Sequence, residues 1–163
     1  MILFRKDQFI LLDCGEGTYG QIVRFFGYEK SRHVLCNLVG VFISHMHADH
    51  HIGLIGLLLG RQHSLARNQQ PIVALLLIAP HQIKHYLHAY HRHFQPIQHL
   101  FQLILSTELL ADNSAAENSQ LIRKEFGLDS IVTTRVRHCS NSFGIALTTS
   151  DGFKFTYSGN YYD

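Results

Sequence analysis

The chain has 163 residues, of which 46% are hydrophobic and 16% are charged. This is enough apolar sequence for the core of one domain, which argues against intrinsic disorder. The net charge of +2 does not indicate nucleic-acid binding by itself, because so small an excess must be clustered to bind phosphates. The thirteen histidines are the unusual feature, since imidazoles bind metal ions and transfer protons.

Hydrophobicity and cysteine content indicate the compartment. No apolar run reaches the ~20 residues that a membrane-spanning helix needs, and the N-terminal residues lack the pattern of a secretory signal. Cys14, Cys36 and Cys139 are an odd number without C-x-x-C spacing, which argues against a disulfide framework. We therefore expect an intracellular protein without a membrane partner, in which the thiols are small buried hydrophobes.

The first predicted elements alternate between strands and helices. Apolar residues 2–4 and 9–14 flank a polar tetrapeptide, which predicts a β-hairpin. A glycine-rich turn follows, and Thr18 is expected to cap a short helix. Residues 39–44 form a continuous apolar run, as in a buried strand, and helical spacing of apolar residues predicts a helix over 52–67.

The second half continues the alternation and becomes rich in strands. Residues 72–79 predict a buried strand, and Pro80 introduces a helix whose aromatic residues, including Phe94, are expected in the core. Asp151-Gly152 predicts a tight hairpin turn. The remaining predictions are a strand over 100–105, a surface loop over 112–120, a helix over 121–126 that Gly127 ends, and strands over 131–137, 144–149 and 153–157. The pattern is that of an α/β fold with hairpins at both ends.

A metal-binding motif follows the strand at 39–44. His45, His47, Asp49 and His50 place four coordinating side chains within six residues. Imidazoles suit zinc and the carboxylate adds an anionic ligand, so one loop could face two ions. His45 and His47 point the same way in an extended loop, whereas Asp49 and His50 lie at the turn into the helix. A histidine-rich loop matches this pattern by chance with odds of roughly a few in a thousand.

The motif resembles the metallo-β-lactamase superfamily, and the wider match resembles tRNase Z, the endonucleases that process tRNA 3′ ends. The order and spacing of the matching segments are similar to those of the catalytic, C-terminal half of the long form of eukaryotes, over about residues 1–160. The segments that carry the resemblance are Leu11–Thr18 with Gln21, Phe42–Leu54, Arg137–Cys139 with Phe143-Gly144, and Tyr157–Gly159.

This resemblance implies a metallo-β-lactamase-like αββα sandwich, C-terminally incomplete, with residues 1–163 as a partial catalytic domain. It implies a zinc-dependent endoribonuclease that removes the 3′ trailer from precursor tRNA in the nucleus or the mitochondrion. The remaining part of the long-form enzyme, or a second subunit, is an implied partner. The alternatives are another hydrolase of the same fold, acting on a thioester or phosphodiester, and an inactive truncated paralogue.

The resemblance also implies the ligands. His45, His47 and His138 would hold one zinc ion, and Asp49 and His50 would hold the other. Two cations lower the pKa of a shared water, and Asp49 would orient the hydroxide and accept its proton. Without the resemblance, His138 would be one histidine among thirteen.

Two departures from the family pattern concern the second ion. Asn160 stands where the family has an aspartate that bridges both metals, and an amide oxygen provides no anionic bridge. The chain also ends at Asp163, before the signature that supplies a further histidine. We therefore expect one tightly bound zinc ion and one weakly bound.

Two weaker signals leave alternatives open. Asp13 could be part of a tight turn or could fix a ligand histidine from behind, as carboxylates commonly do around zinc. His81, His85 and His88 share one helical face with Lys84 nearby, which could be a solvated face, a zinc site or an RNA-phosphate contact. No strong RNA-binding patch is evident from the sequence, so RNA affinity is expected to come largely from the absent half.

Overall fold

The computed structural model describes residues 2–5, 7–113, 120, 122, 123, 126 and 128–160. Eight strands and five α-helices are assigned within these residues, with short 3₁₀ turns at Gln98–Leu100, Ser106–Leu109 and Ala111–Asn113. The strands are β1 (Ile2–Arg5), β2 (Gln8–Leu12), β3 (Leu38–Phe42), β4 (Leu75–Ala79), β5 (Phe101–Leu105), β6 (Leu128–Arg135), β7 (Phe143–Thr149) and β8 (Lys154–Tyr157). The helices are α1 (Thr18–Phe26), α2 (Tyr28–Cys36), α3 (Ala48–His51), α4 (Leu54–Arg67) and α5 (Ile83–His93).

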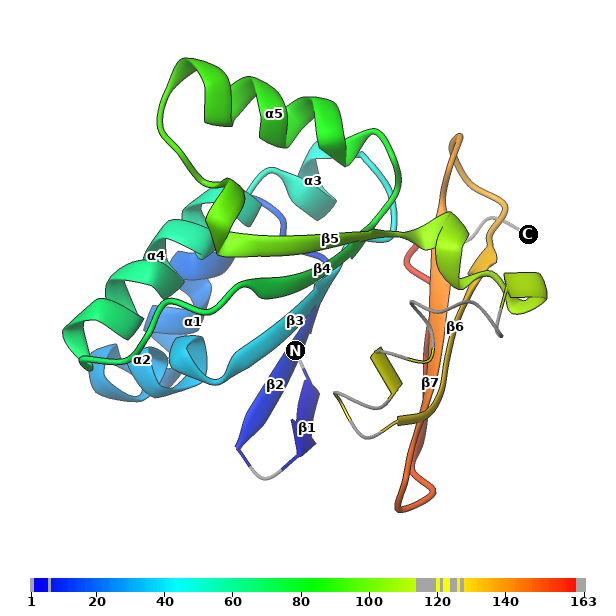
Figure 1. Cartoon of the computed structure of the whole chain (residues 1–163), viewed down its shortest axis with the longest axis horizontal. Coiled ribbons are helices and arrows are strands. Elements are labelled where there is room, and N and C mark those ends of the chain that lie inside the picture. The colour runs from blue at the N-terminus through cyan, green and yellow to red at the C-terminus, as the bar shows by residue number, and fades with distance from the viewer. Residues whose placement is uncertain are drawn as a thin grey trace.

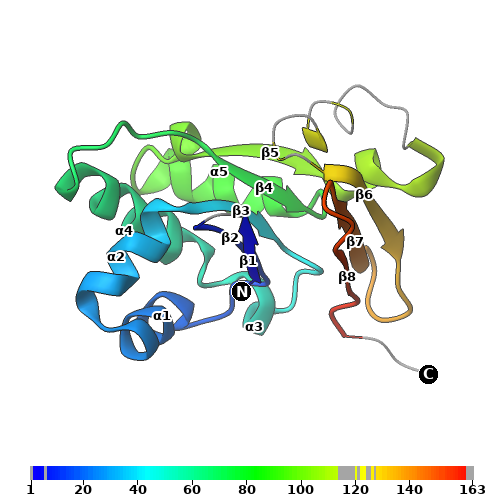
Figure 2. The same ribbon diagram turned by 90° about the horizontal axis from the view of Figure 1, so that it is seen from below.

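The strands form two sheets that face each other. The first has the order β1-β2-β3-β4-β5, with β1 antiparallel to β2 and the other neighbours parallel. The second is the antiparallel meander β6-β7-β8. The α-helices lie on one side of the first sheet and the second sheet lies beyond its other side (Figures 1 and 2). These are the helical layer and the two sheets of the predicted αββα arrangement.

The central strands are apolar throughout because both of their faces are covered. In β3, Val41 packs into the core between the helices and the first sheet, whereas Phe42 packs into the core between the two sheets. In β4, Leu77 and Ile78 divide between the same two cores. Buried parallel strands therefore appear in the sequence as continuous apolar runs without alternation. Packing in these two cores holds both sheets in place at the edge where β3 and β4 end.

The structure corrects several predicted boundaries. Helices α2 and α3 were not predicted, and the helix predicted over 52–67 begins two residues later, as α4. Gly53 separates α3 from α4, and a Cβ atom there would lie 2.0 Å from the carbonyl oxygen of Gly15. The predicted cap at Thr18 is wrong, because Gly17 is the N-cap and the Thr18 hydroxyl donates to the Gly15 carbonyl instead.

Two further predictions fail at the ends of elements. The strand predicted from residue 72 begins at Leu75, because Ile72 and Val73 are exposed before the sheet starts. Phe94 was expected in the core but is 77% exposed, since α5 ends at His93 and the ring only stacks on Tyr90. The loop predicted over 112–120 and the helix predicted over 121–126 lie largely outside the described residues.

In the described part of the chain, no helix combines the length and hydrophobicity needed to cross a bilayer. All three cysteines are free thiols. Cys14 is fully buried and burial raises the pKa of its thiol to about 12, which suits a small apolar side chain. Cys36 and Cys139 are partly exposed, so the expectation of burial holds for Cys14 alone.

Candidate metal centre

The site begins at the edge of the first sheet where two parallel strands end. The amide of Ile43 donates to the carbonyl of Ile78 at 2.8 Å, which carries the pairing of β3 and β4 to this edge. The chain then continues as an extended loop through His47 and enters α3. Because side chains alternate along extended backbone, His45 and His47 project to the same side of the loop.

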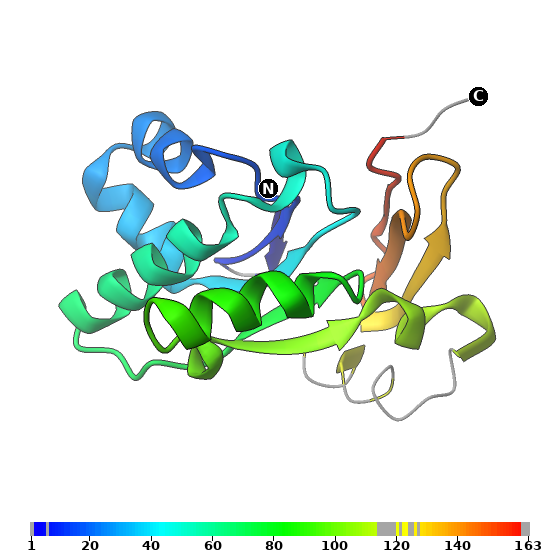
Figure 3. The same cartoon turned by 90° about the horizontal axis from the view of Figure 1, so that it is seen from above.

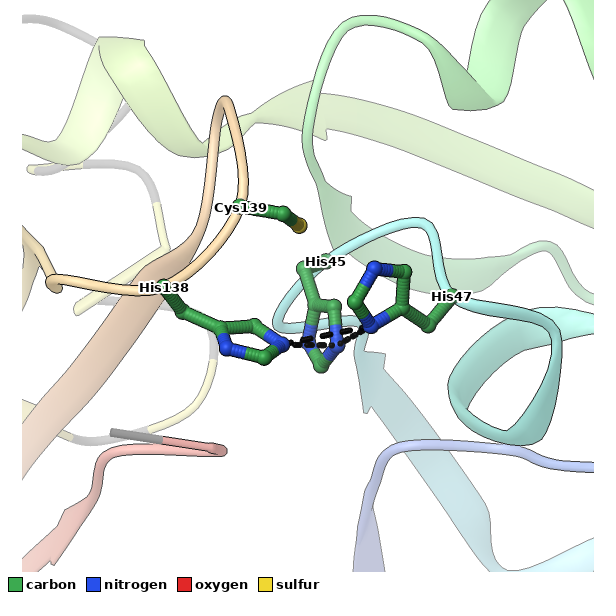
Figure 4. Close-up of side chains that lie close together, drawn as sticks. All are labelled: His45, His47, His138 and Cys139. Carbon is green, nitrogen blue, oxygen red and sulfur yellow. Dashed lines mark hydrogen bonds between the residues drawn. The ribbon is translucent and has the colours of Figure 1, made fainter. Parts of the chain in front are cut away.

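A second loop from the other sheet supplies His138. This loop joins β6 to β7, and the amide of Phe143 at its end donates to the carbonyl of Ser44 at 2.9 Å. That bond ties the second sheet directly to the loop after β3. It places His138 beside His45, although the two are 93 residues apart in the chain (Figure 4).

Three imidazoles converge on one point. His45 Nε2 and His47 Nδ1 are 3.1 Å apart, and His138 Nε2 is 3.2 Å from each of them. Figure 4 shows the three rings pointing toward one another. A nitrogen can direct one lone pair or one N–H at a single partner, so hydrogen bonds cannot satisfy all three sides of this triangle. A tetrahedral zinc ion with Zn–N bonds of 2.0–2.1 Å holds its ligands about 3.3 Å apart, and the triangle fits that spacing.

The surroundings of His45 keep it neutral. Its side chain is completely buried, and burial, together with the neighbouring imidazoles of His50, His138 and His47, lowers the pKa of His45 to about 4. Metal ions bind the unprotonated imidazole, so this environment leaves the ring in its ligating form at neutral pH. The donor set and its electrostatics therefore fit zinc.

Asp13 orients the loop from behind. It lies just after β2 and has the positive backbone φ of 57° that short polar residues tolerate. One of its carboxylate oxygens accepts the backbone amide of Ser44 at 2.7 Å, and the other accepts the Ser44 hydroxyl at 2.8 Å. The Ser44 oxygen lies 2.9 Å from His45 Nδ1 and is free to accept that N–H. With the proton of His45 on Nδ1, the lone pair on Nε2 points toward the nitrogens of His47 and His138.

The same carboxylate orients His50. Its Nδ1 lies 2.7 Å from Asp13 Oδ2, so the Nε2 atom is the one left to bind a ligand. His50 Nε2 lies 3.4 Å from Asp49 Oδ2, and the Asp49 side chain is 78% exposed. Asp13 therefore fixes His50, a predicted ligand, from behind, and of the two sequence-based alternatives this is the one that the structure favours. The turn with the positive φ aims the carboxylate at His50 and at Ser44, which in turn contacts His45.

Close backbone packing holds α3 against the turn after β2. The amide of Cys14 donates to the carbonyl of His50 at 2.7 Å, and the amide of Gly53 donates to the carbonyl of Cys14 at 3.0 Å. A Cβ atom at Gly15 would lie 2.0 Å from the carbonyl oxygen of Asp49. Only glycine permits this approach, so Gly15 serves the position of Asp49 and His50.

Tyr157, at the end of β8, supplies a fourth contact to Asp13. Its hydroxyl donates to Asp13 Oδ2 at 2.7 Å, and its ring packs edge-on against Phe42. Burial and the hydrogen bond to Asp13 raise the pKa of the Tyr157 phenol, so it remains a donor at neutral pH. Two residues further, a Cβ atom at Gly159 would lie 2.8 Å from the Ser44 side chain, and exposed Asn160 follows directly.

The structure thus divides the five predicted site residues into two groups. His45, His47 and His138 come together in one triangle, and Asp49 and His50 lie beside it as a pair. Cys139 joins the first group, since its sulfur and the three imidazole nitrogens all lie within 4.8 Å of one another. Cys139 was not among the residues predicted for the site, although its position next to His138 in the sequence could have indicated it. The contact of Tyr157 with Asp13 has no signal in the sequence that could have predicted it.

Two facing sheets with helices outside the first, and a histidine centre at one edge between them, define the class: this is a metallo-β-lactamase-fold protein. Solved structures agree with this class. The long-form RNase Z from yeast superposes with a TM-score of 0.81 at 19% identity, covering 94% of this chain and 24% of its own. The metallo-β-lactamase fold protein YhfI from Bacillus subtilis superposes with a TM-score of 0.60 at 16% identity, covering 96% and 53%. No protein-family model matches the chain.

Within this class, the chain is similar in sequence to ribonuclease Z proteins. It is 46% identical over 159 residues to "Ribonuclease Z, mitochondrial" of Drosophila melanogaster, covering 94% of this chain. It is 43% identical over 166 residues to mouse "Zinc phosphodiesterase ELAC protein 2", covering 98% of this chain. In both cases the match spans 20% of the relative. The predicted resemblance to tRNase Z is confirmed, and the chain spans about a fifth of the length of these relatives.

Proposed function

We propose that this chain carries the metal centre of a zinc-dependent endoribonuclease that removes the 3′ trailer from precursor tRNA. One observation carries the proposal: the imidazole triangle of His45, His47 and His138, in a chain 46% identical to a protein named ribonuclease Z. A second relative is named a zinc phosphodiesterase, which supports both the metal and the bond that is cut.

In this proposal the five residues have separate roles. His45, His47 and His138 hold the first zinc ion, and His50 and Asp49 face the second. When bound, zinc supplies a Lewis acid and a water molecule whose pKa is close to neutral. Asp49 would serve as the proton acceptor, because its exposed carboxylate lies beside His50 Nε2.

The two metal positions are proposed to differ in affinity. The first has three converging nitrogens with a neutral, buried His45 among them. The second has two groups, because Asp49 and His50 are not part of any larger cluster of potential ligands in the described residues. Asn160 offers an amide oxygen without charge, which compensates less of the repulsion between two dications than a carboxylate does. We therefore propose one tight zinc ion and one weak.

The cellular setting belongs to the same proposal. Precursor tRNA is the proposed substrate, and residues 1–163 are proposed to form part of a catalytic domain whose remaining portion is a partner. The Drosophila relative is named as mitochondrial, which supports that compartment for this chain. A nuclear location rests on the family resemblance alone.

Cleavage of a defined precursor tRNA tests the activity. The chain, loaded with Zn²⁺ or Mn²⁺, is expected to release the trailer and leave a mature 3′ end, and His45→Ala/His47→Ala is expected to abolish release. His63→Ala is the matched control, because His63 is exposed on α4 and removes an imidazole elsewhere. Hydrolysis of a simple phosphodiester without tRNA cleavage would instead support another hydrolase of this fold.

Metal content tests the two affinities. Purified protein dialysed against a weak chelator is expected to retain about one zinc ion, and Asn160→Asp is expected to raise this toward two. Asn141→Asp is a suitable control, since it makes the same substitution in the loop that carries His138. Two retained zinc ions in the unaltered protein would contradict the proposed difference in affinity.

A further inference from the structure

A continuous basic face runs along α5. We define the α5 face as His81, Lys84, His85, His88, His91 and Arg92. His81 stands in the turn just before α5, and at about 100° per residue the other five positions cover about 120° of the helix surface. All six except the half-buried His91 are exposed. Ile83 and Leu87 on the opposite side are buried in the core beneath the helix. The helix is amphipathic, and its solvent side consists of cations and imidazoles.

No acidic residue balances this face. The chain has neither aspartate nor glutamate between Asp49 and Glu108, a stretch that contains α4, β4, α5 and β5. None of the ion pairs within the described residues involves Lys84 or Arg92. A solvated helix face commonly mixes both signs of charge, whereas this one carries a single sign. The two formal cations of this face, Lys84 and Arg92, therefore have no acidic neighbour on α5.

The α5 face borders a groove against the edge strand β5. The groove has a volume of about 400 Å³. Its lining combines Lys84, Leu87, His88 and His91 of α5 with Phe101 and Leu103 of β5. A groove that combines hydrogen-bond donors with apolar side chains suits a sugar–phosphate backbone, whose phosphates meet the donors.

The α5 face begins close to the metal centre. The parallel strands β3 and β4 end at one sheet edge; β3 leads into the loop of His45, and β4 leads into α5 (Figure 3). The Tyr86 hydroxyl donates to the carbonyl of Ile52 at 3.1 Å, and the ring of His51 packs edge-on against Tyr86 at 5.1 Å. These contacts fasten α5 to the segment just after Asp49 and His50. The first positions of the α5 face therefore lie at the metal end of the helix.

The histidines of α5 do not form a metal site of three or more ligands. Within the described residues, the one group of three or more side chains with converging metal-binding atoms is the cluster around His45. The zinc alternative for this helix therefore lacks support. Neutral imidazole N–H groups, lysine and arginine are all hydrogen-bond donors, and phosphate oxygens are the acceptors that such a set matches.

We infer that the α5 face and its groove bind the phosphate backbone of the RNA substrate as it leaves the metal centre. The inference rests on the proposed function for the identity of the polyanion. It also revises the expectation that this chain lacks an RNA-binding patch. Lys84 and Arg92 supply charge, and the imidazoles between them donate hydrogen bonds.

Charge reversal on α5 tests the inference without requiring cleavage. Binding of a 3′-labelled precursor tRNA is measured by fluorescence anisotropy in EDTA, across a salt series, for Lys84→Glu/Arg92→Glu. Arg24→Glu/Lys30→Glu is the matched control, because it makes the same charge change at exposed positions of α1 and α2. The α5 variant is expected to weaken binding about 10-fold and to lower the slope of log Kd against log salt by about 1.5, at about 0.7–0.9 per lost phosphate contact.

The outcomes separate this inference from the proposed function. Equal losses in the α5 variant and in the control, with unchanged melting temperatures, would overturn the α5 site even if the protein cleaves tRNA. A selective loss in the α5 variant without metal-dependent cleavage by the unaltered protein would support the α5 site and contradict the proposed function. Binding of polyglutamate as tightly as RNA, lost in the same variant, would assign the surface to an acidic protein and overturn the inference.

Discussion

The two groups of predicted ligands at the candidate metal centre are built in different ways. His45, His47 and His138 come from both sheets, and their ligand atoms already lie 3.1–3.2 Å apart. Asp49 and His50 are neighbours in α3, and the Asp49 side chain is 78% exposed. The first group is completed by docking between the two sheets, whereas the second lies in one turn of helix, where Asp13 holds His50 and no comparable contact within the described residues covers Asp49. The Asp49 carboxylate is therefore less enclosed than the His50 imidazole beside it.

This difference predicts a division of labour. A preorganised set of three nitrogens binds its ion without paying the entropy of ordering side chains, whereas an exposed carboxylate remains free to reorient and accept a proton. Asp13 connects the groups, because it contacts His50 directly and reaches His45 through Ser44. Substitutions can therefore be chosen that affect the first group, the second group or their connection.

The largest effect is expected from His45→Ala/His47→Ala. Loss of partners that only orient metal ligands already lowers affinity about 10- to 100-fold, so loss of two ligands is expected to lower zinc affinity well beyond 100-fold. Competition with a chromophoric chelator measures this change. His63→Ala should leave the affinity unaltered, and tight binding of zinc by the double variant would show that the triangle is not the site.

Asp49→Asn is expected to affect reactivity more than the tight ion. The substitution keeps the size of the side chain and removes its capacity to accept a proton, which is typically worth 10²–10⁴ in rate. Zinc retained at the three-histidine group should change little, because Asp49 is not in that cluster. Hydrolysis rates and zinc content of the same preparation test both statements. A parallel loss of the tight zinc ion would contradict the separation of the two groups.

Tyr157→Phe tests the connection through Asp13. The variant keeps the ring against Phe42 and loses the hydroxyl that donates to Asp13 Oδ2. Because Asp13 then loses one of its four hydrogen-bond donors, it holds His50 and Ser44 less firmly. Zinc affinity is expected to fall about 10-fold, the low end of the 10- to 100-fold loss that is typical when a group that orients metal ligands is removed. Tyr28→Phe removes a hydroxyl that contacts Arg67 on α4 and is the control. Equal zinc affinity in both variants would show that the Tyr157 hydroxyl does not contribute to metal binding and that the residue acts through the packing of its ring.

The first sheet and most of the predicted site could be predicted from the sequence because they depend on local patterns. The run from β3 into the histidine loop is local, so strand, loop and ligands could be assigned together. His138 could be assigned only through the family resemblance, because its place beside His45 depends on a hydrogen bond between the sheets, from Phe143 to Ser44. The contact of Tyr157 with Asp13 spans 144 residues, and no local pattern encodes it.

The missed features of the helical layer have a similar origin. The division between α3 and α4 arises because Gly53 meets the backbone of Gly15, a contact between segments that periodicity does not report. Phe94 was predicted to be buried because it continues the apolar face of α5, but the helix ends one residue earlier. Spacing along a helix gives the direction of a side chain, and whether another element covers it depends on the tertiary structure.

The smallest effect is expected from Cys139→Ser, which tests whether Cys139 binds metal together with the three histidines. Cys139 lies within the cluster, but its sulfur is 3.2 Å from the Ser142 hydroxyl, and that hydroxyl donates to the Cys139 carbonyl. A hydrolytic zinc ion keeps its fourth position open for water, so a thiolate ligand there would close the site. We therefore expect zinc affinity within about 3-fold of the unaltered protein. The cobalt-substituted protein should lack a thiolate-to-cobalt charge-transfer band. Such a band, lost in Cys139→Ser, would make Cys139 a ligand and the triangle a closed structural site.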